Sequence, residues 1–167
     1  YLLIGHAIIP FFINVVVNVA LGMVTFSGET VSVWTPDNGA VADFLGCCFF
    51  LPLITCLIAT PIVRRQAAAG VVSRIPPGDA PWWAHFLRGP LLLRNLKWGL
   101  IGLTVFAAPV GGAWWLVTDS TVGTTGFLIA KALFAGGLGV IVTPLIAIAE
   151  LSDEPSPDRD EAACGTE

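Results

Sequence analysis

The first apolar stretch of the chain carries a polar stripe with helical spacing. His6, Pro10, Asn14 and Asn18 recur every four residues, so on a helix they share one face. A histidine on such a face can coordinate a metal or a tetrapyrrole, with the two amides holding a polar group of the ligand. The alternative is that Asn14 and Asn18 hydrogen-bond to neighbouring helices. A single histidine without a second ligand favours this packing role, and the sequence itself requires no cofactor.

A second isolated polar residue, Lys131, lies within the last apolar stretch. If a helix begins near Gly126, Lys131 is about 7–8 Å inside it at 1.5 Å per residue. Either its long stem extends to the membrane surface, or its ammonium group pairs with Asp43 or Asp119. In both cases we expect Lys131 to face protein more than lipid.

Six of the eight basic residues lie in one connector, residues 64–97. Within it, residues 80–88 place four large apolar side chains at helical spacing, which predicts a short helix lying in the lipid headgroup region. Arg88 and Arg94 would then contact anionic lipid phosphates, each worth about 1 kcal/mol. The residues that we expect at this interface are Arg64, Arg65, Trp82, Trp83, Arg88, Arg94 and Lys97.

The composition that surrounds these residues is typical of a membrane protein. Apolar residues make up 55% of the chain, charged residues 12%, and the mean hydropathy is +0.81. A soluble domain carries about 25% charged residues. Four stretches approach or exceed the roughly 20 residues that cross a bilayer: 2–26, 44–63, 98–117 and 126–149. Because backbone groups must be paired in lipid, we expect an all-α integral membrane protein with four transmembrane helices.

The distribution of positive charge predicts how this bundle is oriented. The positive-inside rule places residues 64–97 in the cytoplasm, and four crossings then place both termini there as well. The connectors 27–43 and 118–125 contain no Lys or Arg. We interpret residues 1–150 as one transmembrane domain and residues 151–167, rich in Asp, Glu, Pro and Ser, as a disordered acidic tail. The pattern is typical of small bacterial inner-membrane proteins.

Small residues four apart mark the third and fourth predicted spans. The pairs are Ala107–Gly111, Ala108–Gly112, Ala132–Gly136 and Ala135–Gly139. Such pairs let helix backbones approach closely, so they predict tight packing between these two spans. The alternative use is self-association or docking to another membrane protein.

The sequence contains no set of residues typical of catalysis. It has no nucleophile–base pair, no phosphate-binding glycine loop, no metal-binding cysteine spacing and no acid deep in an apolar stretch. We therefore expect a non-enzymatic accessory subunit of a larger membrane complex, with lipids and other integral membrane subunits as partners and no nucleic acid. The alternative is a small homo-oligomeric transporter or channel, in which Asn14, Asn18 and Thr104 would line a water-filled path. A lipid-modifying enzyme would need a site near Asp79 and His85.

Overall fold

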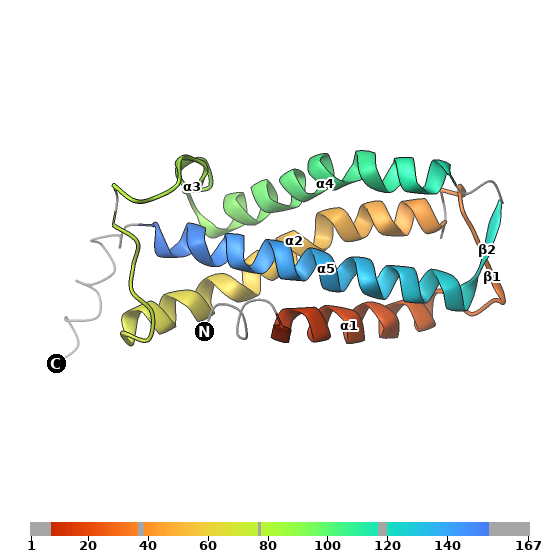
Figure 1. The fold of residues 1–167 in the computed structure, drawn as a ribbon, viewed down its shortest axis with the longest axis horizontal. Coiled ribbons are helices and arrows are strands. Elements are labelled where there is room, and N and C mark those ends of the chain that lie inside the picture. The colour runs from red at the N-terminus through yellow and green to blue at the C-terminus, as the bar shows by residue number, and fades with distance from the viewer. Residues whose placement is uncertain (1–7, 37–38, 77, 117–119, 154–167) are drawn as a thin grey trace.

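The computed structural model describes residues 8–36, 39–76, 78–116 and 120–153. Within these ranges the chain forms an elongated bundle of long helices that alternate in direction (Figure 1). The long helices are α1 (Ile9–Thr25), α2 (Ala40–Ala68), α4 (Leu91–Trp115) and α5 (Thr124–Leu151). A short helix, α3 (Trp82–Phe86), lies in the connector between α2 and α4, where the sequence predicted one.

Three of the helices are long and apolar enough to cross a membrane, namely α2, α4 and α5. Their 29, 25 and 28 residues correspond to lengths of about 43, 37 and 42 Å, compared with about 30 Å of hydrocarbon in a bilayer. The fourth helix, α1, is apolar and has 17 residues. The chain is therefore an all-α protein, and its three long apolar helices indicate an integral membrane protein.

Two helices extend further into the basic connector than the apolar stretches predicted. Helix α2 continues past residue 63 to Ala68, and α4 begins at Leu91 instead of residue 98. The start of α4 is set locally, because Gly89 has a φ of 136° and Pro90 immediately precedes the helix. As a result Arg64, Arg65 and Arg94 lie on helices, where their side chains can face other helices.

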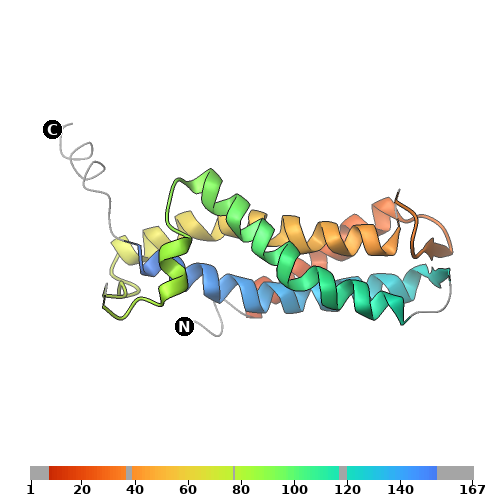
Figure 2. The same ribbon diagram turned by 90° about the horizontal axis from the view of Figure 1, so that it is seen from above.

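Helix α5 is central to the bundle. It packs against both α1 and α2, and α2 packs in turn against α4. Figure 2 shows α4 crossing the bundle at an oblique angle. One apolar core lies towards the basic end and includes Trp98, Leu138 and Ile146, and a second core at the opposite end is rich in aromatic rings.

Glycines on α4 allow it to approach α2 closely. A Cβ atom on Gly102 would lie 2.6 Å from the ring of Pro52 and would overlap the Cys48 carbonyl oxygen. A Cβ atom on Gly99 would lie 3.1 Å from the carbonyl oxygen of Phe49. Any larger side chain at these two positions would force the helices apart.

The small residues predicted to join the third and fourth spans have different neighbours. Gly136 and Gly139 of α5 face α1, where added Cβ atoms would meet the side chains of Phe11 and Asn14. On α4, added Cβ atoms at Gly111 and Gly112 would meet nothing within 4 Å. The predicted packing of the third span on the fourth through these small residues is therefore wrong. Helices α4 and α5 meet instead through large side chains, such as Phe106 and Phe134.

A short β-ribbon closes the end of the bundle opposite the basic connector. Strands β1 (Thr30–Ser32) and β2 (Thr121–Gly123) pair antiparallel, with Val31 opposite Val122. Val31 and Val33 are buried in the aromatic core at this end, which includes Phe44 and Trp114. The ribbon thus joins the α1–α2 connector to the α4–α5 connector.

The close contact at Gly102 can be tested against an open glycine on the same helix. We expect Gly102→Ala to lower the free energy of unfolding by about 1–3 kcal/mol, because the added methyl group overlaps Cys48 and Pro52. The control is Gly112→Ala, whose methyl group meets no other residue and favours helix formation, so stability is unchanged or slightly raised. Unfolding in detergent, followed by circular dichroism, measures both, and equal losses in the two variants would contradict the packing.

Candidate functional site

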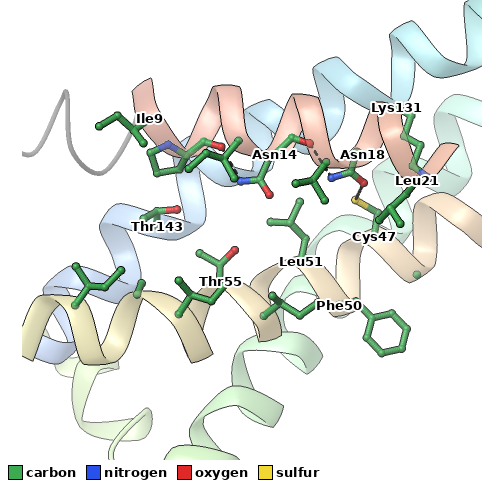
Figure 3. A pocket seen from close by; sticks show the side chains of 18 of the residues that line it. Ile9, Asn14, Asn18, Leu21, Cys47, Phe50, Leu51, Thr55, Lys131 and Thr143 are labelled. Atoms are coloured by element: carbon green, nitrogen blue, oxygen red, sulfur yellow. Dashed lines mark hydrogen bonds between the residues drawn. The ribbon is translucent and has the colours of Figure 1, made fainter. Parts of the chain in front are cut away.

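A groove of about 580 Å³ runs between α1 and α2, with α5 at its base (Figure 3). Helix α1 packs on α5 and leaves the side that faces α2 uncovered. The walls are apolar, and several of the side chains in them are exposed in the single chain. The apolar wall residues include Ile9, Ile13, Val17 and Leu21 of α1 and Phe50, Ile54, Ile58 and Ile62 of α2.

The two asparagines of the predicted polar stripe both line this groove. Asn14 Nδ2 donates to the Pro10 carbonyl oxygen at 2.8 Å, and Asn18 Nδ2 donates to the Asn14 carbonyl oxygen at 2.9 Å. Asn18 Oδ1 accepts a long hydrogen bond from the Cys47 thiol of α2, at 3.8 Å. One N–H of each amide is thus used within α1, and among the described residues only the contact with Cys47 crosses the groove. His6 lies outside the described residues, so its tetrapyrrole role stays a prediction.

An ion pair stands at the end of the groove nearest the β-ribbon. Lys131 Nζ of α5 lies 2.8 Å from Asp43 Oδ1 of α2 and 5.9 Å from the centre of the Phe26 ring. The two charged side chains are 6% and 20% exposed. Lys131 therefore faces protein, and it joins α5 to α2. The other candidate acid, Asp119, lies outside the described residues.

Polar oxygen atoms without hydrogen-bond partners also line the groove. Within the described part of the chain, Thr143 Oγ1, Gln66 Oε1 and Asp43 Oδ2 are buried and have no partner. Thr143 is only 4% exposed, and its hydroxyl points into the groove (Figure 3). A buried polar group without a partner costs about 1–3 kcal/mol. These three oxygen atoms therefore remain available to form hydrogen bonds at the wall of the groove.

A network of charged residues joins three helices at the basic end of the bundle. The Glu150 side chain of α5 is 0% exposed. Its Oε2 atom accepts from Arg64 Nε of α2 at 2.9 Å, and its Oε1 atom accepts from Thr60 at 3.0 Å and from Arg94 of α4. Asp153 adds contacts to Arg94 at 3.2 Å and to Arg64 at 3.5 Å. One carboxylate thus holds α2, α4 and α5 together.

The two charged sites are separated by about one membrane thickness. At 1.5 Å per residue, Glu150 lies about 28 Å from Lys131 along α5, and Arg64 lies about 31 Å from Asp43 along α2. The hydrocarbon core of a bilayer is about 30 Å thick. Each charged site therefore stands near one boundary of the apolar part of the bundle.

The predicted contact between Arg94 and lipid headgroups is wrong. Arg94 is 2% exposed and is paired with Glu150 and Asp153. The physical reason is that α4 begins before Arg94 and directs this side chain at α5, where a buried carboxylate is available. Arg64 and Arg88 are about one-third exposed and also contact the acids of this network.

The remaining residues of the predicted interface divide into exposed and packed groups. Arg65 is exposed, and Trp82 is 83% exposed. Trp83, by contrast, packs against the core at this end. Lys97 donates hydrogen bonds to the carbonyl oxygens of Phe86, at 2.7 Å, and Arg88, at 3.2 Å. Of these four residues, Arg65 and Trp82 present the most surface to a membrane.

Thr104, which was predicted to line a water-filled path, lies apart from Asn14 and Asn18. Thr104 lies on the exposed side of α4 and donates to the carbonyl oxygens of Leu100 and Ile101, so it does not line the groove with Asn14 and Asn18. In the described ranges, no three His, Cys, Asp or Glu residues come together as a metal site would require.

Comparisons with protein-family models, curated protein sequences and solved structures found no match.

Proposed function

We propose that this chain is a non-enzymatic accessory subunit of a larger membrane protein complex. The observation that carries this proposal is an unpartnered face of small residues on α4. Its members are Thr104, Ala108 and Gly112, which follow one another at intervals of four residues, about one helical turn, and are all exposed. We call these three residues the α4 small-residue face.

The α4 small-residue face differs from the glycines that α4 uses within the bundle. Gly99 and Gly102 are buried against α2, whereas a Cβ atom on Gly112 would meet nothing within 4 Å. Transmembrane helices associate in lipid mainly through close packing, because lipid tails are as apolar as the side chains. A face without bulky side chains lets the backbone of another helix come close. This is the surface through which we propose that the chain docks to a neighbouring subunit.

We further propose that the chain crosses the membrane four times with its basic end in the cytoplasm. The four long helices alternate in direction, so α1 starts on the side of the bundle towards which α5 runs, although it begins well short of the end of α5 (Figure 1). All six basic residues of the connector belong to this end. The positive-inside rule then favours a cytoplasmic position for both termini in a bacterial inner membrane. Arg65 and Trp82, exposed at this end, would contact anionic lipid there.

The proposed orientation predicts which surface residues a membrane-impermeant thiol reagent reaches. Single cysteines replace Glu29, near the β-ribbon, or Asp79, in the basic connector, in a variant without native cysteines. Both positions are exposed. We expect Glu29→Cys to be labelled in spheroplasts and Asp79→Cys to be labelled only after the membrane is permeabilised. The reverse pattern would overturn the orientation, and labelling of both in intact spheroplasts would contradict insertion.

The proposed subunit role predicts a stable complex after extraction in mild detergent. We expect other integral membrane proteins to co-purify with the full chain, and we expect Gly112→Leu to lose them, because the new side chain holds the partner helix away. Ala113→Leu is the control, since Ala113 is also exposed on α4 but lies outside the α4 small-residue face. Mass spectrometry of the purified material identifies the partners. A single polypeptide without companions, or equal retention by the two variants, would contradict the proposal.

A further inference from the structure

Four arginines converge on one residue, Asp153, where α5 ends. Arg64 of α2 donates to Asp153 Oδ2 at 3.5 Å, and Arg94 of α4 lies 3.2 Å from the same atom. Arg88 Nε lies 3.8 Å from Asp153 Oδ1, and Arg74 Nη1 donates to the Asp153 carbonyl oxygen at 2.9 Å. We call these four arginines the arginine cluster. Its members come from two helices and from the connector on both sides of α3, so the fold assembles them.

The acids that contact the arginine cluster do not balance its charge. Within the described ranges these acids are Glu150 and Asp153. Because arginine stays protonated in proteins, four positive charges face two negative ones. The carbonyl end of α5 adds only about half a negative charge. Guanidinium groups that share one acid repel one another, and more strongly near the apolar part of a membrane, where the dielectric is low. An added anion would therefore stabilise this arrangement.

The arginine cluster also has unused hydrogen-bond donors. Each guanidinium carries five N–H groups. In the described part of the chain, Arg74 donates one hydrogen bond, Arg88 donates one, to the Ser152 carbonyl oxygen at 3.1 Å, and Arg64 donates two. Arg88 Nε and Arg94 Nε are buried and have no hydrogen-bond partner. Most donors of Arg64, Arg74 and Arg88 therefore remain available to a further acceptor.

Three members of the arginine cluster reach the surface near one boundary of the apolar bundle. Arg74 is exposed, and the side chains of Arg64 and Arg88 are 36% and 34% exposed. Arg94 is buried and closes the inner side of the cluster. Lipid phosphates lie just outside the hydrocarbon of a bilayer, and basic pockets between transmembrane helices bind such headgroups. An anion at this depth can come from the lipid or from the adjoining water.

A phosphate group suits both the charge and the donors of the arginine cluster. A guanidinium binds two phosphate oxygens at once through its planar fork. A phosphate monoester carries about −1.5 to −2 charges at pH 7, which matches the two unbalanced positive charges, whereas a carboxylate carries one. We propose that Arg64, Arg74 and Arg88 bind a phosphate monoester. This site does not depend on the proposed subunit role, because the α4 small-residue face does not include the arginine cluster.

The first test measures phosphate binding to the full chain, purified in a neutral detergent. Native mass spectrometry counts the molecules of phosphatidic acid, a lipid phosphate monoester, that remain bound to each chain. Isothermal titration calorimetry measures the binding of inorganic phosphate. We expect one phosphate group per chain, and the preferred probe shows whether its source is a lipid headgroup or a soluble phosphate. Phosphatidylcholine, which has no net charge, should not be retained. Binding of neither phosphate probe, or equal retention of phosphatidylcholine, would overturn the proposal.

The second test compares arginines inside and outside the cluster. We expect Arg74→Gln to weaken phosphate binding roughly tenfold, because one charged donor group is lost. Arg74→Lys should recover only part of this loss, since it keeps the charge without the planar fork. Arg65→Gln is the control, because it removes the same charge from an exposed position outside the cluster, and neutral detergent offers Arg65 no anionic surface. This variant should bind phosphate as the native protein does.

Two further results would overturn the phosphate site. Equal weakening by Arg65→Gln and Arg74→Gln would show a diffuse effect of positive charge instead of a defined site. Binding that appears only after the acidic residues of 154–167 are replaced by neutral ones would show that the chain's own carboxylates fill the arginine cluster. Circular dichroism of each variant in the same detergent checks that its helices are retained.

Discussion

The arrangement of the helices depends on the burial of one carboxylate, that of Glu150. A buried charge is tolerated only when it is paired and hydrogen-bonded, and Glu150 meets this condition by contacting Arg64 and Thr60 of α2 and Arg94 of α4. Helices α2 and α4 must therefore converge on α5 at the basic end. The Lys131–Asp43 pair holds α5 and α2 together a second time, about one membrane thickness away.

With α2 and α5 held at both ends, the other two helices occupy the remaining sides. Helix α1 packs on the small residues of α5 at Gly136 and Gly139, and this leaves the groove open between α1 and α2. Helix α4 packs on α2 through Gly99 and Gly102, and this leaves the α4 small-residue face directed away from the bundle. The groove and the α4 small-residue face are thus surfaces that internal packing leaves free. The α4 small-residue face suits a neighbouring helix.

The sequence was informative about the helices and about isolated charges. Long stretches without charge predicted the helices, and a lysine within one of them had to face protein. Asp43 was one of the two acids that the sequence offered as a partner for Lys131. The partners of the basic connector could not be predicted, because the spacing of basic residues does not show which of them points inward. Arg94 looked like its neighbours in the connector, and Glu150 was only the last residue of the predicted transmembrane domain, next to the acidic tail. Thr143 gave no signal, since a threonine in an apolar helix normally bonds to its own backbone. Small-residue spacing likewise did not identify the helix that each glycine faces.

A double-mutant cycle on Arg94 and Glu150, measured as free energy of unfolding in detergent, tests the central role of this network most directly. We expect Glu150→Gln to lower stability by about 3 kcal/mol, because it removes the main partner of a buried guanidinium. The exposed Glu29→Gln should change stability little. Combining Arg94→Met with Glu150→Gln should cost less than the sum of the two single losses. The account would be contradicted if Glu150→Gln cost no more than Glu29→Gln, or if the single losses simply added.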